Sequence, residues 1–186
     1  MAITQRRMTL EEFLKLPEEE PALELIDGWV TQKVSPKARH GRLQLALGSF
    51  VNGFGEPRRL AIALPETRVT FAGSSFVPDL VVFRWDRIPL DERGEILDDI
   101  LIPPDIAVEI ISPGQTVKEL ADRCRWYVEH DVEIALLVNT RNRSVTLFRR
   151  STPPLVLSGP DRIDLDSVLP GFQLTVEQLF SALSLR

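Results

Sequence analysis

The sequence contains a single cysteine, Cys124, in 186 residues, so it can form neither an internal disulfide nor a cysteine-clustered zinc site. It also lacks an apolar run approaching the roughly 20 residues that a membrane-spanning helix needs. Residues 1–7 are polar and basic, and no apolar stretch or small-residue cleavage site follows them. These absences predict a cytoplasmic protein that neither crosses a membrane nor performs thiol redox chemistry.

An excess of basic residues is also absent, because the formal net charge is -5. This argues against a protein that coats nucleic acid without discrimination, since such binding depends on Lys and Arg neutralising phosphates. Two local basic clusters remain, and each is either a phosphate contact or a solvated patch. They are Lys33, Lys37, Arg39 and Arg42, and Arg141, Arg143, Arg149 and Arg150.

What the sequence does contain is typical of a globular protein, with 44% hydrophobic and 26% charged residues. The length is close to that of one domain, and no repeat, low-complexity tract or linker divides the chain. We therefore predict a single domain over residues 1–186.

The N-terminal part predicts a hairpin. Residues 23–26 and 29–34 flank the pair Asp27-Gly28, which is a strong signal for a tight turn between two strands. Glu24 is thereby placed on a strand. Ser35 is then expected to cap, and Pro36 to begin, a helix with apolar residues at helical spacing. These residues are Leu43, Ala46, Leu47, Phe50, Val51 and Phe54.

The rest of the chain predicts a mixed α/β fold. The order strand 106–111, helix 116–130 and strand 134–138 is a crossover, which makes the two strands parallel neighbours covered on both faces. Residues 85–104 are polar and predict a surface loop. The remaining predictions are a helix opened by the capping box of Thr9 and Glu12, strands at 60–64, 67–71, 80–83 and 144–148, and a helix at 176–183.

Two carboxylates stand where chemistry is expected. Glu109 interrupts the apolar run 106–111, and a charge buried in a strand requires a metal ion or a cationic side chain as partner. Asp79 follows Pro78 at the mouth of another apolar strand. Two acids on neighbouring strands suit Mg²⁺ or Mn²⁺, which retain waters that a phosphate can replace.

Several short motifs, in order over about residues 8–150, resemble those of the Uma-type restriction endonuclease family within the PD-(D/E)XK nuclease superfamily. They are Glu24-Leu25-Ile26-Asp27-Gly28, Ser35-Pro36 with His40 following, Pro78-Asp79, Val108-Glu109-Ile110-Ile111-Ser112-Pro113, and Trp126-Tyr127 on a predicted helix. Each motif is short, but their joint order makes the resemblance specific.

The resemblance implies a restriction-endonuclease-like mixed sheet flanked by helices, with an N-terminal hairpin. It implies that Asp79, Glu109 and the backbone carbonyl of Ile110 hold Mg²⁺ or Mn²⁺, with Glu24 in support. The implied activity is hydrolysis of DNA to 5′-phosphate ends by a metal-activated water. A homodimer would suit an enzyme that cuts two strands.

The sequence departs from the superfamily at the lysine two residues after the glutamate, because Ile111 occupies that position. Members of the family resembled place a lysine on the next helix, where this chain has Arg123, four residues before Tyr127. An arginine can stabilise a charged phosphate but is a poor proton acceptor. Lys118 lies off that line and is expected to face solvent.

Other interpretations stay open. Glu109 could form a structural ion pair with Arg123, and Asp79 could cap a strand end. His40 is at least as compatible with a hydrogen-bonded core histidine as with a catalytic base, and Cys124, Trp126 and Tyr127 with packing. Rival functions are a nuclease-fold binding or assembly module without catalysis, motivated by Arg123 and the negative charge, and a hydrolase of a small phosphodiester.

Overall fold

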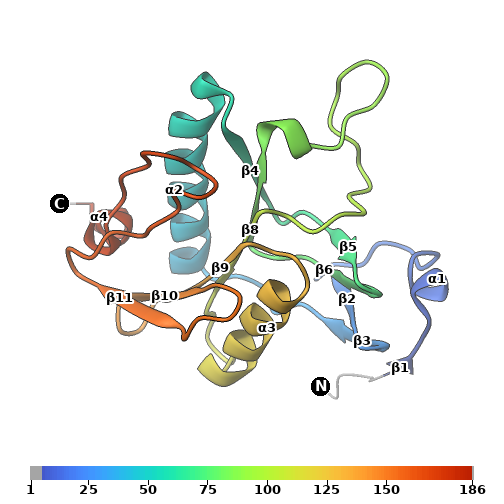
Figure 1. The fold of residues 1–186 in the computed structure, drawn as a ribbon. Helices are drawn as coiled ribbons and strands as arrows, with labels where there is room; N and C mark the ends of the chain where they lie inside the picture. The colour runs from blue at the N-terminus through green and yellow to red at the C-terminus, as the bar shows by residue number, and fades with distance from the viewer. Residues whose placement is uncertain (1–5, 186) are drawn as a thin grey trace.

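The computed structural model describes residues 6–185, and Figure 1 shows how its elements are arranged. In chain order they are β1 Arg6–Arg7, α1 Leu10–Phe13, β2 Leu23–Ile26, β3 Trp29–Gln32, α2 Ala38–Gly55, η1 Glu56–Arg58, β4 Ala61–Pro65, β5 Val69–Phe71, β6 Ser74–Phe76, β7 Leu80–Arg84, η2 Trp85–Arg87, β8 Ile106–Ile110, α3 Val117–Glu129, β9 Ile134–Asn139, β10 Ser144–Phe148, β11 Leu155–Ser158 and α4 Val176–Ser181. The predicted helices and strands are confirmed, whereas β1, β6 and β11 were not predicted.

The strands form two sheets. The larger has six strands in the order β11-β10-β9-β8-β7-β4, and the smaller has five in the order β1-β3-β2-β6-β5. In the larger sheet β8 and β9 are parallel, as the crossover predicted, and the other neighbours are antiparallel. The mixed α/β fold with an N-terminal hairpin is thus confirmed.

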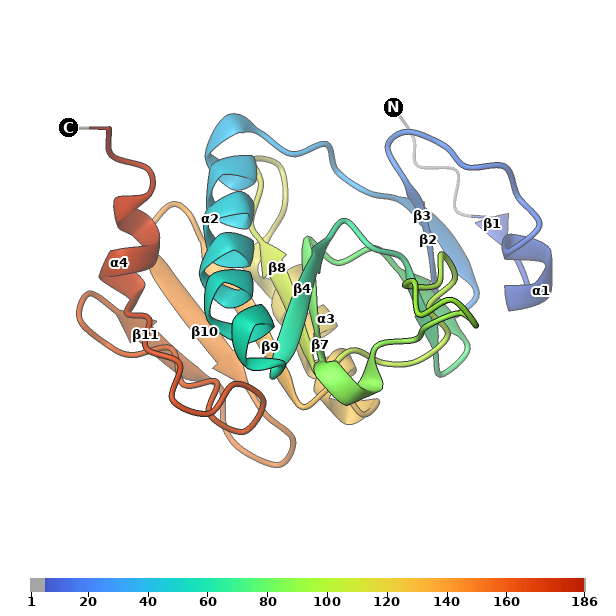
Figure 2. The same ribbon diagram turned by 90° about the horizontal axis from the view of Figure 1, so that it is seen from above.

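The helices cover both faces of the larger sheet, with α2 and α4 on one face and α3 on the other (Figure 2). Successive strand residues point to opposite faces, which divides the apolar residues between two cores. Leu80, Val108 and Leu136 pack beneath α2 and α4, whereas Val81 and Ala107 pack beneath α3. Odd-numbered positions of β8, including Glu109, therefore face α3.

One helix start was predicted wrongly. Helix α2 begins at Ala38, with Lys37 at the N-cap position and no side-chain cap, so Ser35 does not cap it and Pro36 lies outside it. The reason is that the Lys33 amide N–H donates to the carbonyl of Ala22, which prolongs the pairing of β2 with the chain after β3. The chain therefore remains extended past Gln32.

The polar segment between β7 and β8 contains η2 and otherwise follows irregular turns, as predicted for a surface loop, with one isolated bridge between Leu90 and Ile96 and another between Ile100 and Val69 of β5. It extends away from the sheets in Figure 1. Among residues 6–185, no helix combines the length and the apolar character that crossing a membrane requires.

Candidate active site

Asp79 and Glu109 lie on adjacent strands at one end of the larger sheet. Leu80 pairs with Val108 in the antiparallel ladder of β7 and β8, and one further step along that register brings Asp79 opposite Glu109. The backbone N–H of Ile110 donates to Asp79 Oδ2 at 2.6 Å. Both carboxylates are buried and line one cavity of about 600 Å³. The two acids singled out in the sequence are thus brought together.

Glu24 reaches the same cavity from the smaller sheet. Arg123, on α3, donates to its Oε1 at 3.0 Å and to its Oε2 at 2.8 Å, and the N–H of Val77 donates to Oε1 at 2.9 Å. Glu24 is 1% exposed, so the paired arginine is what makes its burial tolerable. Arg123 therefore joins the smaller sheet to the helix that covers the larger one.

Glu109 has two partners on α3. The Tyr127 hydroxyl donates to its Oε1 at 2.7 Å, and Arg123 Nη1 lies 3.4 Å from the same oxygen. Tyr127 is buried, as predicted, but its hydroxyl also fixes the glutamate, which the sequence did not indicate. Cys124 is buried as well, and Lys118 faces solvent and pairs with Asp122.

Lys33 enters the cavity although the sequence grouped it with surface residues. Its Nζ lies 2.7 Å from Asp79 Oδ1 and 2.5 Å from Glu66 Oε2, and its side chain is only 10% exposed. The hairpin register could have indicated this position. Glu24 pairs with Thr31, and alternate residues of an extended chain share a face, so Lys33 points to the same side as Glu24.

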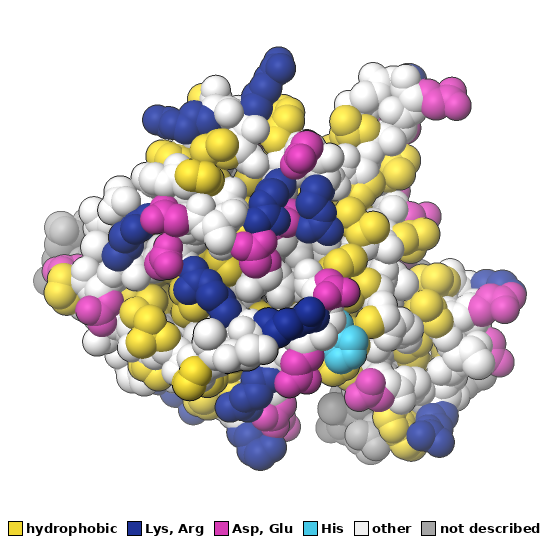
Figure 3. Space-filling model, in the orientation of Figure 1, with side chains coloured by type: hydrophobic (Ala, Val, Ile, Leu, Met, Phe, Trp, Pro, Cys, Tyr) yellow, Lys and Arg dark blue, Asp and Glu magenta, His cyan; other side chains and the backbone are white. Residues whose placement is uncertain are grey.

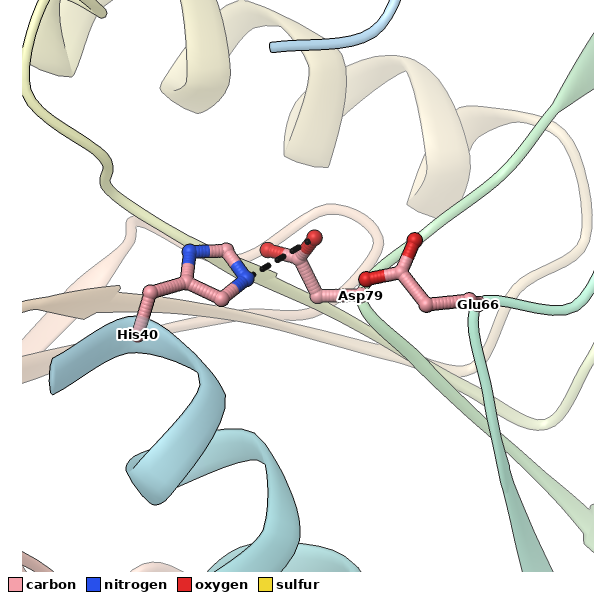
Figure 4. A group of neighbouring side chains, drawn as sticks. All are labelled: His40, Glu66 and Asp79. Carbon is pink, nitrogen blue, oxygen red and sulfur yellow. Dashed lines mark ion pairs between the residues drawn. The ribbon is translucent and has the colours of Figure 1, made fainter. Parts of the chain in front are cut away.

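His40 approaches Asp79 from α2. Its Nδ1 is hydrogen-bonded with Ser112 Oγ at 2.9 Å, while its Nε2 lies 3.2 Å from Asp79 Oδ1. Gln44, one turn further along α2, donates to the Asp79 carbonyl at 2.6 Å and to Glu66 Oε1 at 2.9 Å. Figure 4 shows His40 and Glu66 on either side of Asp79. His40 is therefore a buried, hydrogen-bonded histidine that also borders the cavity.

The side chains beside Asp79 control its charge. Burial alone would raise the pKa of Asp79, but His40 and Lys33 outweigh burial and hold that pKa below its usual value. Burial would likewise lower the pKa of Lys33, yet Asp79, Glu109 and Glu66 keep it above its ordinary value. Asp79 is thus a carboxylate and Lys33 an ammonium group at neutral pH.

Glu109 is different. Burial is the main reason that its pKa rises to about 7, and the charges of Asp79 and Glu24 raise it further against the lowering effect of Arg123. Burial also raises the pKa of the Tyr127 hydroxyl well above its usual value, so that group remains a hydrogen-bond donor. A carboxyl group with a pKa of about 7 can exchange its proton for a cation around neutral pH.

The raised pKa of Glu109 predicts a pH-dependent stability. The folded chain retains a proton that the unfolded chain, with an ordinary pKa of 4.5, has released, so this stabilisation is complete below about pH 4.5 and is lost as the pH rises through about 7. At about 1.4 kcal/mol per pKa unit, the Glu109→Gln variant should gain roughly 3 kcal/mol over the wild type between pH 5 and pH 8.

Urea unfolding in a metal chelator at the two pH values measures this difference. The matched control is Glu129→Gln, which removes an exposed carboxylate at the C-terminal end of α3 that does not line the cavity. Parallel pH dependence of the wild type and Glu109→Gln would contradict the raised pKa.

Two overlapping donor sets could hold a divalent cation. Asp79 and Glu109 form the pair expected from the sequence, and both offer carboxylate oxygens to the cavity. His40, Glu66 and Asp79 form a second set, whose donor atoms lie within 4.8 Å of one another. Carboxylate and imidazole donors suit Mg²⁺, Mn²⁺ and Zn²⁺. The residues present therefore fit a divalent ion, and Asp79 belongs to both sets.

Comparison with known proteins identifies the family of this chain. Residues 10–177 match the Uma2 family, described as "Putative restriction endonuclease". The chain belongs to the Uma2 family. The crystal structure of a putative nuclease of the DUF820 group from Anabaena variabilis ATCC 29413 superposes with a TM-score of 0.91 at 36% identity, covering 95% of this chain and 99% of that one. No curated protein matches the chain.

The resemblance noted in the sequence is thus confirmed, and this Uma2 chain has a nuclease fold.

The two basic clusters noted in the sequence do not stay together in the folded chain. Lys37, Arg39 and Arg141 line a second cavity of about 370 Å³ that shares His40 with the first. Arg150 instead donates to the Val128 and Glu129 carbonyls at the end of α3, and Arg149 pairs with Asp164.

Proposed function

We propose that this Uma2 chain is a metal-dependent endonuclease that hydrolyses DNA phosphodiester bonds in the cavity between the two sheets. The observation that carries the proposal is a charge imbalance at one place. Among the described residues, Glu24, Asp79 and Glu109 are buried carboxylates around this cavity, and only Lys33 and Arg123 offset them there. When Glu109 is ionised, these three carboxylates outnumber the two cations, and a bound divalent cation would offset the excess negative charge.

Asp79 and Glu109 are the proposed ligands of Mg²⁺ or Mn²⁺, with the Ile110 carbonyl completing the set. When bound, such an ion lowers the pKa of a coordinated water and offsets charge developing on a phosphate. The N–H of Ile110 holds Asp79, and the Tyr127 hydroxyl holds Glu109, so both carboxylates are oriented before any ion arrives. This preorganisation is what a metal site requires.

Arg123 acts in this proposal through the acids. Its two hydrogen bonds to Glu24 and its contact with Glu109 keep both carboxylates at the cavity wall. It also lines the cavity, so its charge lies where a scissile phosphate would bind. Glu24 supports the site by holding Arg123 in place.

A polynucleotide is favoured over a small phosphodiester. Lys37, Arg39 and Arg141 lie beside the cavity, where they can contact phosphates flanking the scissile one. On the face seen in Figure 3, basic side chains alternate with acidic ones, so no broad basic surface covers that face. DNA binding would thus depend on the few basic residues beside the cavity, and the affinity for DNA should fall as the salt concentration rises.

The test is nicking of supercoiled plasmid DNA. The wild type should nick with Mn²⁺ or Mg²⁺ and stop when a chelator is added, because the buried acids need the cation to bind a phosphate. Glu109→Gln, which removes a proposed ligand, should reduce nicking to background, whereas the matched control Glu129→Gln should nick as the wild type does.

Nicking by Glu109→Gln at the wild-type rate would contradict the proposal and indicate a contaminant. Salt-sensitive DNA binding by a wild type that never nicks would favour the rival binding module, in which Arg123 replaces a catalytic lysine. Activity on small phosphodiesters without DNA binding would favour the other rival function, a hydrolase of a small phosphodiester.

A further inference from the structure

The Lys33 ammonium group lies where a cation ligated by carboxylates would lie. It is within 2.7 Å of Asp79 Oδ1 and 2.5 Å of Glu66 Oε2, and it comes from the extended segment between β3 and α2. Gln44 donates to Glu66 Oε1, which holds that carboxylate beside Lys33 although Glu66 is itself exposed. Two acids are therefore held around one side-chain cation.

His40 supplies the second, independent observation. Its Nε2 is buried, and its 3.2 Å approach to Asp79 Oδ1 lacks the geometry of a hydrogen bond; within residues 6–185 this atom has no other hydrogen-bond partner. Its other ring nitrogen, Nδ1, is hydrogen-bonded with the Ser112 hydroxyl. When Nδ1 carries the proton and donates to Ser112, Nε2 presents a lone pair to the space beside Asp79. This is the arrangement found for histidines that bind metals.

We propose that Lys33 is a resident cation that fills a second metal position in the cavity. That position is bounded by Asp79, Glu66 and the Nε2 atom of His40, as Figure 4 shows. Lys33 and a metal ion cannot occupy it together, because their positive charges would lie within a few ångströms of each other. The ammonium group thus supplies at that position the positive charge that a second divalent ion supplies in enzymes with paired metals.

The consequence is a site built for one divalent ion. Asp79 is shared by the two positions, so a carboxylate that could bridge two metals bridges one metal and one ammonium group instead. This rests on the proposed function for the first ion, at Asp79 and Glu109. The second position follows from the arrangement of Lys33, His40, Glu66 and Asp79 and does not involve Glu109.

The experiment counts the Mn²⁺ ions bound per chain by isothermal titration calorimetry and by the loss of the electron paramagnetic resonance signal of free Mn²⁺. The wild type should bind one ion. Lys33→Met, which keeps the length of the side chain but removes the charge, should bind two. Adding His40→Ala to Lys33→Met should return the count to one, because the second position loses its imidazole ligand.

Lys33→Gln provides an uncharged alternative should the methionine variant unfold, and Lys15→Met is the matched control, since Lys15 is an exposed lysine that pairs with Glu11. The same count for the wild type and both Lys33 variants would overturn the proposal, as would two ions in the wild type. If the wild type binds none and Lys33→Met binds one, the Lys33 proposal holds and the proposed site at Glu109 fails.

Discussion

The Asp79→Asn variant should nick plasmid DNA about a thousand-fold more slowly than the wild type, or not at all. Asparagine preserves the size of the side chain and can still accept the Ile110 N–H, so the ladder beside it is retained. It lacks the charge that binds a divalent ion and pairs with Lys33. Removing one preorganised electrostatic partner of a reacting phosphate typically costs 10²–10³-fold or more.

Nicking rates under excess Mn²⁺ measure this effect, and thermal unfolding in parallel shows whether the variant is folded. The matched control is Asp98→Asn, in the exposed loop before β8, which removes the same charge outside the cavity. A folded Asp79→Asn that nicks at the wild-type rate would exclude Asp79 as a ligand, and with it the hydrolytic function proposed for the cavity.

The Arg123→Met variant should lose about 3–5 kcal/mol of unfolding free energy, which is the usual cost of removing one partner from a buried ion pair. Methionine fills much of the space of the arginine stem but leaves Glu24, 1% exposed, with a buried charge opposed only by the Val77 N–H. Glu109 loses its nearest cation on α3 as well. The loss arises from unpaired carboxylates rather than from a cavity in the core.

Urea unfolding at pH 8 measures the loss. The control is Arg125→Met on the same helix, whose arginine is half-exposed and pairs with Asp122, so its removal should cost less than about 1 kcal/mol. The double variant Arg123→Met with Glu24→Gln should recover the part of the loss that comes from the Arg123–Glu24 pair, because neither partner of that pair then leaves a charge behind. Equal losses for Arg123→Met and Arg125→Met would contradict a structural role for the Arg123–Glu24 pair.

The positions of Asp79 and Glu109 on strands could be predicted because each is marked by the residues next to it in the sequence. Glu109 interrupts an apolar run that is long enough to be recognised as a buried strand, and Asp79 follows a proline at the start of another. The strand, helix and strand that contain Glu109 and Arg123 form a crossover whose handedness and pairing are almost invariant. The approach of these residues to one another followed from that topology.

The partners of those acids could not be predicted in the same way. Arg123 was expected to act on a phosphate or on Glu109, yet its shorter contacts are with Glu24, 99 residues away in the chain. Lys33 belongs to a basic cluster that the sequence left as either a phosphate contact or a solvated patch, and no sequence pattern marks Glu66. Ser35 has the residue type of a helix cap, but the extended pairing beyond β3 moved the helix start to Ala38.

By itself, the sequence determined the order of the elements, the mixed sheet and the two acids, because hydrophobic periodicity and turn residues act over a few positions. Only the tertiary structure decided which charges neutralise which. The smaller sheet brings Glu24 to Arg123, and the segment after β3 brings Lys33 to Asp79 and Glu66. Electrostatic energy in a buried cavity depends on separation in space, and separation along the chain does not reveal it.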